Sequence, residues 1–288
     1  MNKQSITAGI FLNTDKKKSA AIYSRLYSLL KEYAAEVITV ENGAKFRSGQ
    51  SEIEKLKNCC SVVFAVGGDG TLLAAHRSLF GTDINILGVN AGRKGFLIEL
   101  DEDSMENGVE SYFAGKYTVE ERGALYGCIC PVGKGESEGN LIALNEFAIT
   151  RSSTTGIIKI KIYVGGELTE WFSADGVLIS TPTGSTAYSL SAGGPVVMPG
   201  VRCTLITPIC AHSLHTRPFI APDDLEVEVV TEYRDGDVLL IADGQQSQKI
   251  PEGYKAVIRK ADISARFVTI DRKNMYAAFR DKMLEHTD

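Results

Sequence analysis

A glycine-rich segment with a single carboxylate, Gly67-Gly68-Asp69-Gly70-Thr71, is the first part of the sequence that could do chemistry. Glycines between an apolar run and a helix let the backbone approach a ligand closely. The free amides of the helix that follows bind anions such as phosphate. A carboxylate repels phosphate, so Asp69 indicates a different chemical role, either taking a proton from an acceptor hydroxyl or holding a metal that bridges phosphates. The alternative is a tight turn in which Asp69 caps the helix.

A second glycine-rich segment, residues 88–96, again follows an apolar run. Its basic residues Arg93 and Lys94 could meet phosphates, although a solvated basic turn explains them equally well. If both segments follow parallel strands, they lie at the carboxyl ends of neighbouring strands, where α/β sheets bind ligands. The sequence contains neither a P-loop nor the Gly-x-Gly-x-x-Gly dinucleotide fingerprint.

A third cluster begins at Asp175-Gly176 and continues through residues 180–195, which are rich in Ser, Thr and Gly. Such a run makes a poor helix and a poor core, but it offers many short hydrogen-bond donors and one aromatic face, Tyr188. The alternative is a hydroxyl-rich surface loop. Because an extended apolar run leads directly into the cluster, we expect a ligand-binding segment.

Composition narrows the classes of function. The 288 residues are 44% hydrophobic and 23% charged, which excludes a disordered chain and allows two domains of ordinary size. The net charge of −5 argues against sequence-independent binding of nucleic acid. The six cysteines form no Cys-x-x-Cys pair and the four histidines have no zinc-ligand spacing, so we expect buried, reduced thiols. No signal peptide or membrane-spanning run is recognisable, and we expect a cytoplasmic protein without a membrane partner.

Strands and helices are expected to alternate up to about residue 117. A Ser-x-x-Glu pattern at Ser51 resembles a capping box that opens a short helix. Alternation of this kind favours a Rossmann-like α/β domain with a parallel sheet. The expected strands cover residues 6–12, 36–40, 61–66 and 85–89, and the expected helices cover 17–35, a short segment from 51, 71–80 and 103–115.

After residue 117 the apolar residues recur with period two, as in Ile158, Ile160 and Ile162. Turn signals separate these runs, so we expect a β-sandwich domain over residues 118–269. Residues 274–284 return to helical spacing, and we assign about 270–288 to the first domain together with 1–117. The expected strands of the second domain cover residues 124–130, 141–149, 158–164, 176–181, 203–209, 225–229, 237–242 and 255–270.

Four elements taken in order resemble the NAD kinase family. They are the Gly67–Thr71 loop, Asn145-Glu146, Asp175-Gly176 and residues 180–195. The glycine-rich loop alone is unspecific, since diacylglycerol kinase-like and phosphofructokinase-like enzymes have similar loops. The run from Thr181 to Tyr188 is far more specific.

The resemblance implies phosphorylation of NAD at the 2′-hydroxyl of its adenosine ribose, giving NADP. It implies ATP with Mg²⁺ as the donor, or in some members inorganic polyphosphate, with no tightly bound, protein-ligated metal. It also implies an α/β domain plus a β-sandwich domain, with a C-terminal segment that returns to the first domain, and assembly as a homodimer or homotetramer.

The resemblance also implies roles for individual residues. Asp69 is the expected catalytic base, and Asp175 is expected at the nicotinamide end, across a subunit boundary. The other expected substrate-binding residues are Gly70, Phe96, Asn145, Glu146, Ser173, Thr186, Ala187, Tyr188, Ser189, Leu190, Ser191 and Gln245. The expected phosphate-donor site comprises Gly67, Gly68, Gly70, Thr71 and Arg93.

Two positions depart from the family pattern. Ser173 stands where a basic residue is common, which places that ligand contact in question. Ala211 stands where a proline precedes the histidine, and we expect His212 to be structural. Two other functions fit parts of the sequence: a lipid or sugar kinase with a similar Gly-Asp-Gly loop, and a non-catalytic NADP-binding regulator. A retained Asp69 argues against the second, because binding alone needs no base.

Overall fold

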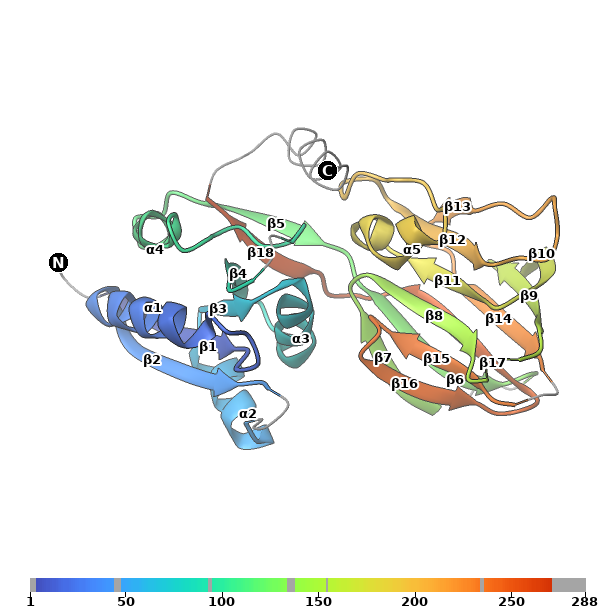
Figure 1. Ribbon diagram of the computed structural model, residues 1–288, viewed down its shortest axis with the longest axis horizontal. Coiled ribbons are helices and arrows are strands. Elements are labelled where there is room, and N and C mark those ends of the chain that lie inside the picture. Colours follow the sequence, from blue (N-terminus) through green and yellow to red (C-terminus); the bar gives the residue numbers. More distant parts are fainter. Residues whose placement is uncertain are drawn as a thin grey trace. The chain divides into compact units, whose positions relative to one another are not determined.

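A computed structural model describes residues 4–43, 48–92, 95–133, 138–153, 155–233 and 236–270 of the chain (Figure 1). These residues divide into two compact units. The first contains residues up to Glu121 and those from Ala265 onward, and the second contains Arg122–Ser264. Each unit has its own hydrophobic core.

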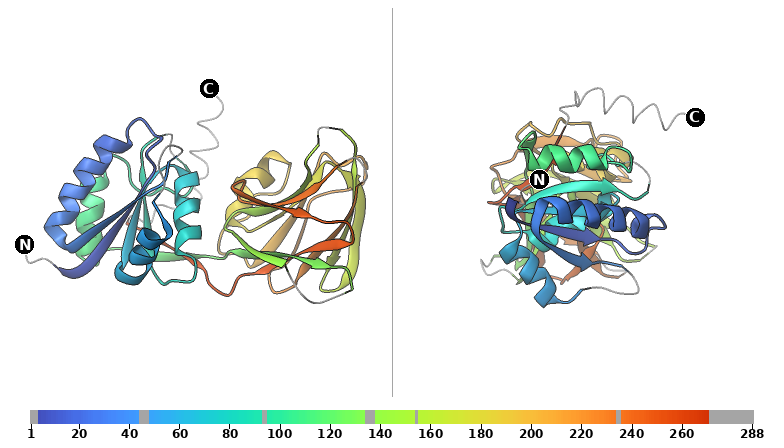
Figure 2. Two further views of the ribbon diagram at one scale, coloured as in Figure 1. Left: turned by 90° about the horizontal axis from the view of Figure 1, so that it is seen from below. Right: turned by 90° about the vertical axis from the view of Figure 1, so that its left-hand side faces the viewer.

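The first unit is a six-stranded sheet in the order β2-β1-β3-β4-β18-β5, and the pairs from β2 to β18 are parallel. Helices α1 and α4 contact each other on one face, and α2 and α3 contact each other on the other (Figure 2). Because both faces are covered, β3 is buried along its whole length. The strands are β1 (Gln4–Leu12), β2 (Ala34–Glu41), β3 (Val62–Gly67), β4 (Asn85–Asn90), β5 (Thr118–Arg122) and β18 (Ala265–Thr269), and the helices are α1 (Ser19–Tyr33), α2 (Gln50–Cys59), α3 (Asp69–Leu79) and α4 (Met105–Phe113).

The second unit is a sandwich of two antiparallel sheets (Figure 1). Its core is built from apolar side chains of both sheets, among them Phe147, Ile160 and Val229. One sheet has the order β10-β9-β14-β17-β6-β7, with β6 (Leu125–Pro131), β7 (Glu138–Ala143), β9 (Ile158–Val164), β10 (Glu167–Ala174), β14 (Val227–Glu232) and β17 (Tyr254–Lys260). The other has the order β13-β12-β11-β8-β15-β16, with β8 (Glu146–Arg151), β11 (Gly176–Ser180), β12 (Cys203–Ile209), β13 (Phe219–Pro222), β15 (Val238–Ala242) and β16 (Gln246–Ile250).

The predicted fold class is confirmed, including the return of the chain to the first unit. β18 provides that return as far as residue 270 by pairing with β4. The expected helix over 274–284 lies outside the described residues. β5 and β18 both join the first sheet, so the units divide at 121/122 and 264/265. The domain limits expected from the sequence had instead placed both strands in the second domain.

Two long apolar runs were wrongly predicted to be single strands. The run over 141–149 is two strands in different sheets, β7 and β8, separated by Leu144 and Asn145. The run over 255–270 is β17 and β18, which belong to different units. Both runs keep an apolar residue at almost every second position, so the period alone hides the change of sheet.

Two smaller expectations were also wrong. The capping box at Ser51 does not form, because α2 begins at Gln50 with Gly49 as its N-cap and the Ser51 hydroxyl bonds to Glu52 instead. All six cysteines are free, but only four are buried. Cys59 is exposed at the end of α2, and Cys210 is exposed in a left-handed turn after β12 (φ 48°).

Candidate functional site

The glycine-rich loop of the first unit lies where β3 ends and α3 begins. Gly67 is the last residue of β3, Gly68 is the N-cap of α3, and Asp69 is the first residue of the helix. Gly67 pairs with Asn90, the last residue of β4. The two glycine-rich segments therefore follow the carboxyl ends of adjacent parallel strands, as predicted.

The Asp69 carboxylate is held by the second of these segments. Its Oδ2 accepts the backbone N–H of Phe96 at 2.7 Å, and its Oδ1 accepts that of Leu97 at 3.2 Å. Gly95 makes this approach possible, because a Cβ at Gly95 would lie only 1.9 Å from Asp69 Oδ1. The structure thus brings Asp69 and Phe96 together, in an orientation fixed by two backbone donors.

Thr71 closes the same loop. Its hydroxyl oxygen accepts the backbone N–H of Gly68 at 3.4 Å and the side-chain amide of Asn13 at 2.9 Å. Because Thr71 is buried, its hydroxyl stabilises the loop from the interior of the protein. Asn13, which follows β1, was not anticipated from the sequence. Arg93 lies outside the described residues.

The second set of predicted residues lies in the second unit, at the crossing from β7 to β8. Asn145 precedes β8 and Glu146 is its first residue. The hydroxyl-rich run packs against this crossing: Thr181 donates its backbone N–H to the Asn145 carbonyl at 2.9 Å. A Cβ at Gly184 would lie 2.0 Å from the same carbonyl oxygen, so only glycine fits there.

Residues 186–191 present some side chains to solvent and bury others. Thr186 ends a short 3₁₀ helix (Thr183–Thr186), Ala187 connects this helix to α5, and the other four residues form α5 (Tyr188–Ser191). The Tyr188 side chain is 45% exposed, whereas the Ser189 hydroxyl is buried against Thr207 at 2.9 Å. Tyr188 is therefore available to a ligand, and Ser189 anchors the segment to β12. Thr186, Ala187 and Leu190 are partly buried, and Ser191 is exposed.

Asp175 directly precedes β11 and lies beside Arg151, at the end of β8 opposite to Glu146. Its Oδ1 accepts two N–H groups of Arg151, from Nε at 3.1 Å and from Nη2 at 2.7 Å. Arg151 also donates to the Ser153 carbonyl at 2.6 Å. Asp175, Arg151 and Tyr188 line a hollow of about 440 Å³. Arg151 was not predicted, because an arginine at a strand end is typical of a solvated edge.

β8 therefore connects two groups of predicted residues. Five residue steps along an antiparallel strand span about 17 Å, which separates Glu146 from Arg151. Tyr188 contacts both ends, since its backbone N–H bonds to Glu146 and its side chain lines the hollow beside Asp175. An elongated ligand with polar groups at both ends would match this layout.

The Glu146 side chain is buried, and its Oε2 has no hydrogen-bond partner among the described residues. Burial and the negative charge of Asp243 raise its pKa to about 7, and the Tyr188 N–H lowers it in part. Near neutral pH this carboxyl is consequently close to half-protonated, so it can both donate and accept hydrogen bonds.

Stability of the ligand-free protein should depend on this group. Between pH 4.5, the ordinary pKa of the group, and pH 7, the unfolded chain releases the Glu146 proton while the folded chain keeps it. Stability therefore falls as pH rises through this window, by at most about 3 kcal/mol for this group. We expect Glu146→Gln to raise the stability at pH 8 and to leave it unchanged at pH 4. Urea unfolding of both proteins from pH 4 to 8 measures the difference, and parallel curves would contradict it.

The remaining predicted residues are less closely grouped. Gln245 is exposed in the β15–β16 turn, whose Asp243 N–H donates to the Glu146 carbonyl at 3.0 Å. Ser173 is in β10 and does not line the hollow beside Asp175. Its carbonyl accepts the N–H of His212 at 2.8 Å, and the His212 side chain is exposed.

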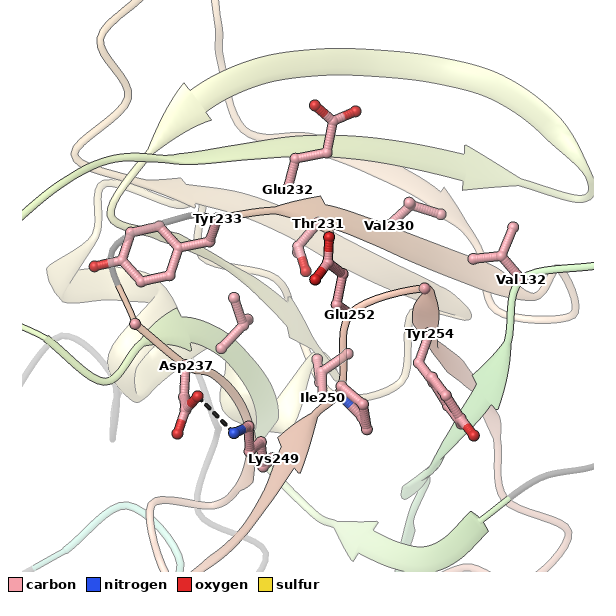
Figure 3. A pocket seen from close by; sticks show the side chains of 14 residues that line it. Val132, Val230, Thr231, Glu232, Tyr233, Asp237, Lys249, Ile250, Glu252 and Tyr254 are labelled. Atoms are coloured by element: carbon pink, nitrogen blue, oxygen red, sulfur yellow. Dashed lines mark ion pairs between the residues drawn. The ribbon is translucent and has the colours of Figure 1, made fainter.

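A larger hollow of about 800 Å³ lies in the second unit, around the ends of β14, β16 and β17 (Figure 3). An ion pair of 2.7 Å between Lys249 and Asp237 crosses part of it. None of the predicted site residues that the structure describes lines it.

Comparison with known protein families gives two matches that together cover most of the chain. The ATP-NAD kinase N-terminal domain matches residues 8–117, and the ATP-NAD kinase C-terminal domain matches residues 144–270. Two curated relatives are the NAD kinases of Desulforamulus reducens, 35% identical over 97% of both chains, and of Bacteroides fragilis, 34% identical over 97% of this chain and 98% of the other. Among the described residues, no helix has the length and apolar character to cross a membrane.

Two solved structures have the same fold. The crystal structure of yeast NADH kinase complexed with NADH matches with a TM-score of 0.84 at 22% identity, covering 99% of this chain and 89% of the other. An NAD kinase from Archaeoglobus fulgidus in complex with ATP matches with a TM-score of 0.75 at 24% identity, covering 96% and 97%.

Proposed function

The chain belongs to the NAD kinase family and is a kinase that phosphorylates NAD, and we propose that it transfers the γ-phosphoryl group of ATP to the 2′-hydroxyl of the adenosine ribose, giving NADP. Family membership decides against a lipid or sugar kinase and against a non-catalytic regulator. The observation that carries the proposal is the Asp69 carboxylate, fixed by two backbone N–H groups at the N-terminus of α3.

Asp69 acts in this proposal as the general base. Each carboxylate oxygen has one accepted backbone bond and keeps a further lone pair, so the group can still accept the proton of an attacking hydroxyl. Because the two bonds hold its orientation, little reorganisation is needed when the phosphoryl group is transferred. The loop glycines leave room for the donor phosphates at the N-terminus of α3; they are Gly67, Gly68 and Gly70. Thr71 stabilises the loop.

We assign NAD to the predicted residues of the second unit. Asn145 and Glu146 offer an amide and a half-protonated carboxyl, which suit ribose hydroxyls and an amino group. Tyr188 offers a half-exposed ring for stacking. Asp175, oriented by Arg151, receives the nicotinamide end, which is positively charged in NAD.

Mg²⁺ is proposed to enter with the nucleotide. No group of three or more His, Cys, Asp or Glu side chains among the described residues is arranged to hold a metal ion. In phosphoryl-transfer sites Mg²⁺ usually keeps several waters and is bound by substrate phosphates together with one or two protein carboxylates. Asp69 is the nearest candidate protein ligand in the loop, and Mg²⁺ would neutralise charge on the phosphates there.

Assembly as a homodimer or homotetramer also remains a proposal. Supporting it, β10 is an edge strand, and two large apolar side chains on it are exposed: Trp171 at 72% and Leu168 at 53%. Exposed apolar side chains on an unpaired edge are typical of a surface that a partner covers.

Incubation of the purified chain with NAD, ATP and Mg²⁺ tests the proposed reaction. NADP is expected, detected by an NADP-specific dehydrogenase. Parallel reactions replace ATP by polyphosphate and NAD by NADH, and a further one uses NAD that lacks the 2′-hydroxyl. We expect no product from the deoxy substrate, and its phosphorylation would contradict the assigned position of transfer.

A further inference from the structure

We propose that Asp243 is a positioning residue for substrate binding: its carboxylate holds the crossing between β7 and β8 in the shape that presents Asn145 and Glu146 to NAD. This inference rests on the proposed function only in assigning Asn145 and Glu146 to the substrate. Asp243 lies in the hairpin turn between β15 and β16, almost one hundred residues later in the chain.

The carboxylate of Asp243 accepts three successive backbone N–H groups. Oδ2 accepts from Leu144 at 2.9 Å, and Oδ1 accepts from Asn145 at 2.8 Å and from Glu146 at 3.2 Å. In the opposite direction, the Asp243 N–H donates to the Glu146 carbonyl at 3.0 Å. The turn and the crossing are therefore clamped to each other by four hydrogen bonds.

These donors need such a partner because the chain changes sheets at this point. β7 ends at Ala143 and β8 begins at Glu146, so the N–H groups of Leu144 and Asn145 fall outside both strands. Leu144 is fully buried, and water cannot reach its backbone. A buried N–H without an acceptor is strongly destabilising, and Asp243 supplies the acceptor at the residues that carry the site.

An aspartate at this position could be explained by the conformation of the turn alone, and a choice of substitutions distinguishes that explanation from the proposed role. Asp243 has a φ of 48°, in the left-handed region, and is followed by Gly244 at 64°. Aspartate, asparagine and glycine all tolerate this conformation. Only aspartate offers acceptor oxygens on both branches of its side chain. The turn geometry alone would accept Asp243→Asn, whereas the three-donor contact would not.

Asp243 also acts electrostatically on the residue that it positions. Its negative charge is the charge that raises the pKa of Glu146, in addition to burial, while the Tyr188 N–H acts in the opposite direction. Removing the charge at Asp243 therefore lowers the pKa of Glu146, although burial, the larger cause, still raises it. The hydrogen-bonding character of Glu146 toward a ligand would change with it.

The test compares Asp243→Asn with Asp237→Asn in the full chain. We expect Asp243→Asn to raise the Kd and KM for NAD by about tenfold or more and to change kcat much less, since Asp69 is in the other unit. The pH dependence of NAD affinity that arises from ionisation of Glu146 should move to lower pH. Asp237→Asn is the control: it removes an exposed carboxylate that pairs with Lys249 and lies just before β15, the strand that leads to Asp243. It should change neither the affinity for NAD nor the pH dependence of that affinity.

Two further measurements separate positioning from general stability. In the Glu146→Gln background, Asp243→Asn should no longer move the pH profile, and its effect on NAD affinity should be smaller than in the wild type. Asp243→Gly is the second variant, since glycine keeps the turn and admits water to the three amides. It should also weaken NAD binding.

Three outcomes would overturn the proposal. They are unchanged NAD affinity in folded Asp243→Asn, effects fully additive with Glu146→Gln, or failure of both Asp243 variants to fold, which would assign Asp243 to folding alone. Because Kd is measured by calorimetry without turnover, the result does not depend on the kinase assay. A wild-type chain that binds NAD but forms no NADP would overturn the proposed function and leave this inference standing.

Discussion

Asp69→Asn is expected to lower kcat for NADP formation by at least about 10²-fold, the range that loss of a general base produces. The substitution keeps the shape of the side chain but removes its ability to accept a proton. It also places an amide NH₂ against one of the two backbone donors, Phe96 or Leu97. Asp69→Ala removes all of these contacts and should be at least as inactive.

NAD binding should be largely unaffected in both Asp69 variants, because the residues assigned to NAD binding lie mainly in the second unit. Initial rates of NADP formation give kcat, and calorimetry gives the Kd for NAD. Asp103→Asn, an exposed carboxylate before α4, is the matched control in the same unit and should behave as the wild type. Near-normal turnover in either Asp69 variant would refute the assignment of the base.

The architecture of the first unit follows from its sequence because local signals and tertiary packing agree there. The apolar run ending at Gly67 is a strand covered on both faces, and the glycines that follow mark its exit into a helix. The same reasoning placed two glycine-rich segments at adjacent carboxyl ends, which the register of Gly67 with Asn90 confirms.

The sandwich was harder to divide into strands because its strand ends are decided by distant contacts. Between Leu141 and Ile149 no glycine or proline marks a turn, yet the chain leaves one sheet after Ala143 and joins the other at Glu146. The acceptor that makes this crossing possible is Asp243, about one hundred residues away. Hydrophobic period reports burial of side chains and carries no information on which sheet supplies the hydrogen-bond partners.

In the candidate site, too, some residues could be predicted from local sequence signals and others depend on distant contacts. Asp69, Asn145 and Glu146 could be predicted because their types and spacing suit the chemistry. Arg151 and Asp243 could not, since an arginine at a strand end and an Asp-Gly turn both have ordinary explanations. Their contacts with Asp175 and with the crossing appear only when the strands are paired.

Gly95→Ala is expected to reduce kcat nearly as much as loss of Asp69 itself, although Gly95 carries no functional group. The added Cβ would lie 1.9 Å from Oδ1 and 2.4 Å from Oδ2 of Asp69. The carboxylate must leave its position, and both bonds from Phe96 and Leu97 break with it. Gly92→Ala is the matched control, since a Cβ there meets no atom of the described residues within 4 Å and the substitution should leave kcat unchanged.

The double variant that combines Gly95→Ala with Asp69→Ala tests this prediction most directly. If Gly95→Ala acts by displacing the carboxylate, it should have no further effect on kcat in the Asp69→Ala background, where there is no carboxylate to displace. It should also destabilise the Asp69→Ala protein less than the wild type, because the clash is absent. Measuring kcat and urea unfolding for the four proteins completes the cycle. Independent, multiplicative losses in kcat would mean that Gly95 affects catalysis by a route other than the position of Asp69.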